Sequence, residues 1–332
     1  MRARTRLAFP LAVVAILVST ASPAQADPAE PTNYQSTVLG LTPSTNVAVF
    51  EVVGGDSFLQ VTVAPGHEVL VPGYFDEPYI RIDADGSVWL NEDSPAYYIN
   101  FDRYGNAEIP DDVDGQGESR WVMVARHGTY AWHDHRSHWM SPDLPPVVSG
   151  DERQVVFPWE IPVVIDGRDT VIDGELSWIP SESPVPGLLA GVIALLPLAF
   201  WTRGRATLLL TVIAAASLVS ASVILSEMMA TPANARVFPV WIVYAVVALA
   251  AAGVGLTRAR SRPRLASRLA LFSALVLLVW TVAASDILWR PILPSVLPEI
   301  AARAFLGLVM WSAAGVAVLA VVDEVQALRV PR

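Results

Sequence analysis

The chain has 332 residues, of which 53% are hydrophobic and 16% are charged, and its mean hydropathy is +0.44. This apolar excess excludes a disordered chain and argues against a purely soluble protein. Because the chain has no cysteine, disulfides, thiolate zinc sites, iron–sulfur sites and blue-copper centres are excluded.

The net charge of −10 divides the chain into three segments. Residues 1–26 carry +3, residues 27–183 carry 27 acidic residues against 7 arginines, and residues 184–332 carry 5 acidic residues against 12 arginines. All five histidines lie in the middle segment. Its net charge of −20 repels nucleic acid and attracts cations, so we expect no nucleic-acid partner.

The first segment is typical of an export signal. A start of six residues with three arginines precedes the apolar run Leu7–Val18, and Ala24-Gln25-Ala26 has small residues at the spacing of a cleavage site. The apolar run is short for a membrane span, so cleavage after residue 26 is favoured over a signal anchor. The mature chain would begin at Asp27, outside the cytoplasmic membrane.

The middle segment, residues 27–183, predicts an all-β extracytoplasmic domain. After a polar lead to about Ser44, short runs of β-branched and aromatic residues alternate with turn signals. The expected strands lie around Val47 and Val49, at 58–63, 79–83, 87–91, 121–125 and 128–134, and on both sides of 166–169. This spacing indicates an immunoglobulin-like β-sandwich. Whether the part before residue 115 forms a subdomain of its own is left open.

The middle segment also contains a histidine cluster within residues 127–140, which read HGTYAWHDHRSHWM. His133 and His135 are two residues apart, so on a strand their rings would point to the same face and could share a metal ion. If a turn followed at residues 136–137, it would bring His138 back beside them.

Two further side chains could complete such a site. His127 could join only through a bend at Gly128, whereas Met140 would supply a soft thioether ligand. Copper is the expected metal and zinc the alternative, because Cu(II) binds imidazole more tightly. The candidate metal ligands are therefore His133, His135, His138, Met140 and His127.

Two other interpretations of the cluster stay open. A buried network of histidine, aspartate and arginine would stabilise the domain without binding a ligand, and a surface with histidines would bind a protein partner. Trp132 and Trp139 would exclude water around a metal in the first interpretation and fill the core in the others.

Two stretches resemble copper proteins. The sequence from Gly128 to His135 (GTYAWHDH) resembles the G-T-x-W-Y-H-x-H strand of multicopper oxidases, in which the two histidines bind copper. The resemblance implies that His133 and His135 are the copper ligands here. The other paired-histidine motifs of that family and its cysteine are missing, so its oxidase reaction is not implied.

The second resemblance concerns residues 157–168 (FPWEIPVVIDGR) and 174–178 (GELSW), which are similar to the closing hairpin of CopC-type copper-carrier domains. Those domains are immunoglobulin-like sandwiches whose hairpin carries D-G-H. Arg168 stands here in the position of that histidine, and the mature chain would begin with Asp27 rather than a ligand histidine. The resemblance therefore implies the fold and not the copper site of that family.

The last segment, residues 184–332, predicts an all-α membrane domain of five transmembrane helices. Each apolar stretch approaches the ~20 residues that cross ~30 Å of hydrocarbon; the stretches are about 186–201, 206–226, 237–256, 269–287 and 304–322. The connections 202–205 and 257–268 are rich in arginine, whereas 227–236 and 288–303 are not. Arginine-rich connections face the cytoplasm, so the middle segment is expected outside and the C-terminus in the cytoplasm.

Two functions are consistent with these features. The first is a multi-pass cell-membrane protein that binds metal on its extracytoplasmic side, in copper capture or homeostasis, in contact with lipid and beside a membrane-protein partner. The second is a scaffolding envelope membrane protein whose β-sandwich binds a protein or polymer. An enzyme is the least favoured class, because the common nucleophile, phosphate-binding and zinc-protease motifs are missing, and no catalytic residue is assigned.

Overall fold

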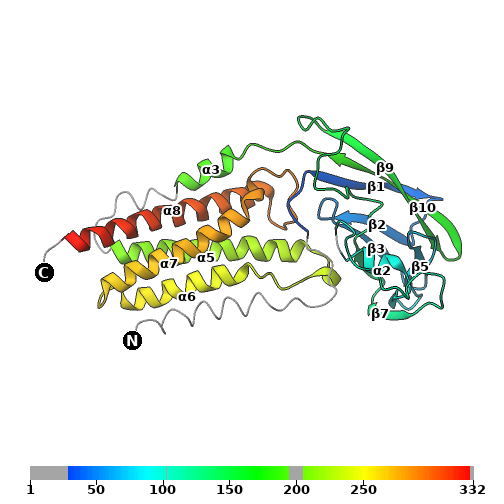
Figure 1. Ribbon diagram of the computed structural model, residues 1–332, viewed down its shortest axis with the longest axis horizontal. Helices are drawn as coiled ribbons and strands as arrows, with labels where there is room; N and C mark the ends of the chain where they lie inside the picture. The colour runs from blue at the N-terminus through cyan, green and yellow to red at the C-terminus, as the bar shows by residue number, and fades with distance from the viewer. Residues whose placement is uncertain (1–28, 102, 194–204, 330–332) are drawn as a thin grey trace.

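The computed structural model describes residues 29–101, 103–193 and 205–329, with the side chains of 327–329 left undescribed. The expected export signal and residues 194–201 of the first expected span lie outside these ranges. Sheets form one end of the molecule, and the helices form an elongated bundle that extends away from them (Figure 1). The fold is therefore a β-rich N-terminal part followed by a helical C-terminal part.

The strands form two antiparallel sheets. The larger has seven strands in the order β1-β10-β9-β4-β5-β6-β7, and the smaller has the order β2-β3-β8. The strands and the one short helix among them are β1 Tyr34–Thr42, β2 Ala48–Val53, β3 Phe58–Val63, β4 Val69–Pro72, β5 Pro78–Ile82, β6 Val88–Asn91, α2 Pro95–Ile99, β7 Trp121–Ala125, β8 Thr129–Trp132, β9 Gln154–Ile165 and β10 Arg168–Trp178.

The expected strands are present, and two strands were not expected. β1 lies within the stretch taken for a polar lead; it is an edge strand with several exposed side chains, so its apolar alternation is weak. β4 has only four residues and ends at a proline. The immunoglobulin-like arrangement is not confirmed, because the strands divide seven and three, whereas an immunoglobulin constant domain divides four and three.

The core of the β-rich part lies between the two sheets. Phe50, Leu59 and Val61 of the smaller sheet share one buried cluster with residues of the larger sheet such as Ile80 and Ile161. The long hairpin of β9 and β10 turns at Asp166 and Gly167, which have φ of 50° and 72°, as a tight two-residue hairpin requires. The smaller sheet is therefore held against the larger one by apolar burial.

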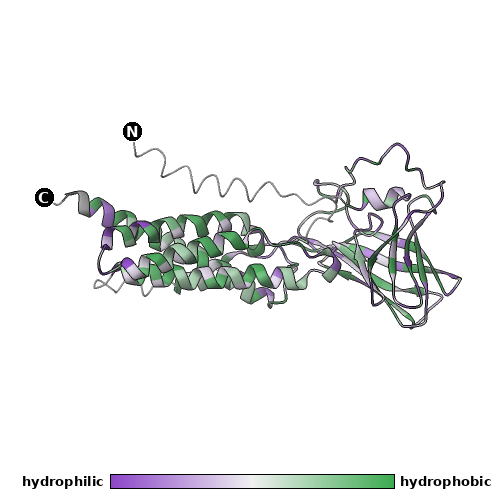
Figure 2. Ribbon diagram, turned by 90° about the horizontal axis from the view of Figure 1, so that it is seen from below, coloured by the Kyte–Doolittle hydropathy of each residue, from purple (hydrophilic) through white to green (hydrophobic). Residues whose placement is uncertain are grey.

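The helical part packs around a second apolar core. Its helices are α3 Val185–Val192, α5 Arg205–Ala230, α6 Ile242–Arg258, α7 Pro263–Ala283 and α8 Glu299–Arg329, with the short 3-10 helices η2 Ala233–Ala235 and η3 Ser285–Leu288 between them. Apolar residues run along the length of the bundle (Figure 2). Three helical stretches are long and apolar enough to cross a membrane, namely α5, α7 and Glu299–Gln326 of α8.

The five expected spans are therefore reduced to three among the described residues. The third expected span is α6, which has only 17 residues, because its apolar run begins after the prolines and 3-10 turn that follow α5. The first expected span begins with the eight-residue α3 and continues into residues outside the described ranges.

The two parts are joined at the loops that connect α5 to α6 and α7 to α8. The amide of Asn234 bonds to both backbone groups of Ala131 in β8, at 3.1 Å and 2.7 Å. Thr32 and Ile292 exchange backbone hydrogen bonds of 3.0 Å and 3.2 Å. Because β8 is an edge strand, the Asn234 side chain takes the place of a neighbouring strand at that residue.

Glycines allow α3 and α8 to approach closely. Gly187 and Gly191 of α3 are four residues apart and both face Gly307 of α8. A methyl group on Gly307 would overlap the carbonyl oxygen of Gly187. This is the packing of small residues at a four-residue spacing that brings membrane helices together.

We therefore expect Gly307→Ala to destabilise the helical part by about 1–3 kcal/mol through overpacking, which should lower the thermal unfolding temperature of the full chain in detergent. Gly253→Ala is the matched control, because Gly253 of α6 has no atom within 4 Å of an added Cβ. That substitution should leave the unfolding temperature unchanged or raise it, since alanine favours a helix. Equal effects of the two substitutions would contradict the close packing.

Candidate functional site

The chain leaves β8 at Trp132 and makes a turn around the carboxylate of Asp134. This carboxylate is fully buried and accepts hydrogen bonds from Nε1 of Trp132 at 3.0 Å and from the backbone N–H and Nε of Arg136 at 3.1 Å and 2.8 Å. The backbone N–H and hydroxyl of Ser137 both donate to the Asp134 carbonyl oxygen at 2.9 Å. Asp134 therefore folds residues 132–137 into one compact turn.

The ionisation of Asp134 is consistent with this role. Burial by itself raises the pKa of the carboxyl, but the charge of Arg136 and the hydrogen bonds from Arg136 and Trp132 outweigh burial, so the pKa lies below its usual value. The guanidinium also stacks over the ring of Tyr74, 5.2 Å from its centroid, and donates to the Pro72 carbonyl oxygen at 3.3 Å. The turn is thereby fixed to the end of β4.

Three imidazole rings meet on this turn. The ring of His138 lies edge-to-face against His135, with 5.0 Å between centroids, and 6.5 Å from His133. His133 stacks on Phe58 at 4.6 Å, and its Nδ1 bonds to the Ser57 carbonyl oxygen. His133 and His138 are each only 1% exposed, whereas His135 is half-buried.

His138 has one occupied and one open nitrogen. Its Nδ1 lies 3.2 Å from the Trp139 carbonyl oxygen; an oxygen of this kind only accepts, so Nδ1 carries the proton and Nε2 carries the lone pair. No group among the described residues hydrogen-bonds to Nε2, which is buried. A buried polar atom without a partner is unusual and calls for a functional explanation.

Met140 and His135 both lie against Gly105, whose missing side chain leaves room for them. A Cβ on Gly105 would be 3.1 Å from Cε1 of His135 and 3.2 Å from Cε of Met140. Gly105 also has a φ of 69°, which favours glycine. Met140 is 38% exposed, so the cluster extends from the buried His138 to solvent at Met140.

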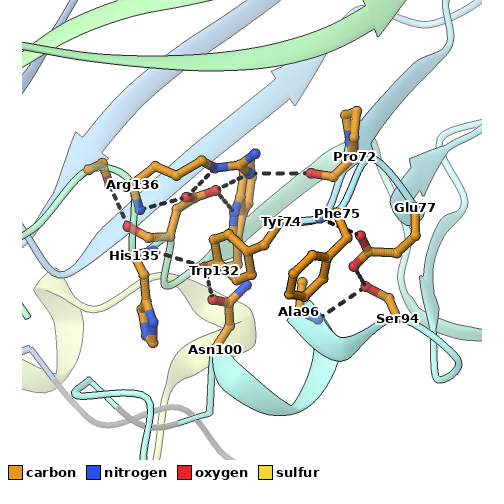
Figure 3. Close-up of polar contacts among 12 residues, drawn as sticks. Pro72, Tyr74, Phe75, Glu77, Ser94, Ala96, Asn100, Trp132, His135 and Arg136 are labelled. Atoms are coloured by element: carbon orange, nitrogen blue, oxygen red, sulfur yellow. Dashed lines mark hydrogen bonds and ion pairs between the residues drawn. The ribbon is translucent and has the colours of Figure 1, made fainter. Parts of the chain in front are cut away.

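Tyr74 supports the other side of His135. Its hydroxyl accepts a hydrogen bond from the backbone N–H of His135 at 3.0 Å and donates to Oδ1 of Asn100 (Figure 3). Burial raises the pKa of Tyr74 well above its usual value, so the hydroxyl keeps its proton and can make both bonds.

The charged groups around the cluster are paired. Arg103, whose charge helps to lower the pKa of His138, forms an ion pair of 2.5 Å with the buried Asp56. Arg136 is paired with Asp134. The candidate ligands themselves are imidazole and thioether side chains, which carry no negative charge, so the described surroundings favour a ligand of low charge.

The structure thus brings together His133, His135, His138 and Met140, and not His127. His127 is exposed at the turn between β7 and β8, where it has a φ of 74°, and makes no ring contact with the others. The expected placement of His133 and His135 on one strand is wrong, because β8 ends at Trp132 and both follow it. The expected turn before His138 is present, and it brings the ring of His138 beside the rings of His133 and His135.

Within the described ranges, no three His, Cys, Asp or Glu side chains are arranged to hold a metal ion. Ser57, Tyr74 and Gly105 were not predicted, because they lie in other segments and carry no motif.

Comparison with protein-family models, curated proteins and solved structures finds no match to this chain.

The open nitrogen of His138 leads to a prediction about its protonation. Burial, and then the charge of Arg103, lower the pKa of His138 to about 3. In the metal-free full chain, ¹⁵N NMR of labelled histidine should show one imidazole that stays neutral at pH 5 with its proton on Nδ1. The His138→Gln variant should lose that signal.

The lowered pKa of His138 also determines how the stability of the fold depends on pH. The unfolded chain takes up a proton near pH 6.5 and the folded chain does not, so stability is lost as the pH falls from about 6.5 towards 3. A His138 that protonates near pH 6.5 in the folded chain would contradict its burial.

Proposed function

We propose that this chain is a membrane-anchored copper-binding protein that captures Cu(I) on its extracytoplasmic side, with His135, His138 and Met140 as ligands. The observation that carries the proposal is the buried lone pair of His138 Nε2, which no described residue engages. This nitrogen belongs to a ring that contacts the ring of His135. His135 and Met140 both lie against Gly105. The function is that expected from the sequence, with three of the five expected ligands.

The hydrogen bonding of His138 supports a role as a metal ligand. Histidines that bind metal commonly donate their other ring N–H to a backbone carbonyl or a carboxylate, which fixes the tautomer and aims the lone pair. The Trp139 carbonyl oxygen is placed to do this for His138. Its low pKa means that no proton competes with the metal for Nε2 at neutral pH.

The donor set favours copper over zinc. A thioether is a soft ligand that selects Cu(I), and imidazole binds copper as well. A singly charged ion is also less costly to place among neutral donors whose neighbouring charges are already paired. His135 and Met140 are the two solvent-accessible members, so they would rotate towards His138 when the ion binds.

His133 has a positioning role in this proposal. Its Nδ1 is bonded to the Ser57 carbonyl oxygen and its ring is stacked on Phe58, so it holds the buried side of the cluster in place. His127 has no part in the site.

The membrane arrangement we propose has five spans, with the β-rich part outside and the C-terminus in the cytoplasm. α6 has 17 residues and measures about 26 Å, close to the ~30 Å of hydrocarbon, and α3 would begin the remaining span. The β-rich part contacts the two loops that are poor in arginine, and Arg258 to Arg268 lie at the opposite end. This agrees with arginine-rich connections in the cytoplasm.

A scaffolding envelope protein is the second candidate. It is favoured by the buried network of Asp134, Arg136 and Trp132, which is complete without a ligand. In that case the histidines would contribute only to packing, and the β-rich part would bind a protein or polymer.

Cu(I) affinity separates the two candidates. The full chain in detergent is titrated with Cu(I) in competition with a chromophoric chelator. We expect one ion per chain, and at least a tenfold loss of affinity in His138→Gln and in Met140→Leu, since a lost ligand costs more than about 1.4 kcal/mol.

His67→Gln is the matched control, because His67 pairs with Asp166 on the surface, at 2.7 Å, away from the cluster; it should bind as the unmodified chain does. If His138→Gln lowers the unfolding temperature equally with and without copper and leaves the affinity unchanged, the copper proposal is wrong and the scaffolding candidate stands.

A further inference from the structure

A cavity of about 920 Å³ lies at the end of the helical bundle opposite the β-rich part. It is formed by the start of α5, the connection between α6 and α7, the start of α7 and the C-terminal part of α8. Its walls combine apolar side chains such as Leu208 with hydroxyls and arginines. Because the helices are of membrane-spanning length, this end of the bundle lies at the level of lipid headgroups.

The cavity has unbalanced positive charge. Of the lining residues, Arg205 is paired with Asp323 at 3.1 Å, and Glu324 is paired with Arg268, which lies outside the lining. Arg260 and Arg264 also line the cavity and are exposed, and neither forms an ion pair with a described residue. Two guanidinium groups are therefore available for an anion.

A buried hydroxyl faces the same cavity. Ser267 is 7% exposed, and its Oγ has no hydrogen-bond partner among the described residues. Most other buried serines of the bundle donate to a backbone carbonyl of their own or a neighbouring helix, as Ser217 and Ser273 do. Ser267 differs because it lines a cavity, and an unpaired hydroxyl in a membrane protein is unfavourable. It indicates a ligand with a hydrogen-bonding group.

We propose that this cavity binds the phosphate group of an anionic phospholipid. Arg260 and Arg264 would bind the phosphate, the Ser267 hydroxyl would donate to it, and the apolar wall would contact the upper acyl chain. The cavity also includes the first residues of α7, which begins at Pro263, and the N-terminal end of a helix favours an anion. Basic pockets between membrane helices bind anionic lipid headgroups in this way. The proposal is independent of copper binding.

Native mass spectrometry of the full chain in a neutral detergent tests this site. The protein is titrated separately with dioleoyl phosphatidylglycerol, dioleoyl phosphatidylcholine and inorganic phosphate. We expect phosphatidylglycerol to bind at least about tenfold more tightly than phosphatidylcholine, and Arg260→Gln/Arg264→Gln to abolish this preference. Ser267→Ala should weaken phosphatidylglycerol binding several-fold without lowering the unfolding temperature in lipid-free detergent, because it removes only an unpaired hydroxyl.

Arg258→Gln/Arg262→Gln is the matched control, since it removes the same charge from the same connection and neither residue lines the cavity; it should keep the lipid preference. Equal binding of the two lipids, or an equal loss in this control, would overturn the site. Binding of inorganic phosphate as tight as that of phosphatidylglycerol would overturn the lipid assignment in favour of a soluble anion.

Discussion

The buried carboxylate of Asp134 is the constraint on which the candidate site depends. A charged group without solvent needs several hydrogen-bond donors, and Asp134 obtains them from Trp132 on one side and Arg136 on the other. Meeting this requirement bends the chain immediately after β8. The bend places the imidazoles of His133 and His135 next to that of His138, which a continuous strand could not do, because its side chains alternate between two faces.

The same turn lies next to the contact between the β-rich part and the helices. Ala131, three residues before Asp134, is held by both polar atoms of the Asn234 amide, and Asn234 belongs to the connection between α5 and α6. A change at the histidine cluster would therefore act close to the helical bundle. Under the proposed function, this contact would link copper capture to the helical part.

Much of the architecture could be predicted from the sequence, because alternating runs such as Phe58–Val63 and the turn at Asp166 and Gly167 carry local signals. β1 and β4 could not, because an edge strand with exposed residues and a four-residue strand have little periodicity. The histidine cluster could be found from composition, because three of the five histidines lie within residues 133–138, but its geometry could not. The ion pair of Asp134 and Arg136 follows the end of β8 and joins side chains that are two residues apart. The contributions of Ser57, Tyr74 and Gly105 arise only from tertiary packing.

The most direct test of the account is X-ray absorption spectroscopy at the copper edge of the Cu(I)-loaded full chain. Because the chain has six methionines and no cysteine, a sulfur scatterer can come only from a thioether. We expect imidazole nitrogens together with one sulfur around copper, and loss of the sulfur alone in Met140→Leu. A first coordination sphere of nitrogen and oxygen only, identical in that variant, would contradict the central claim.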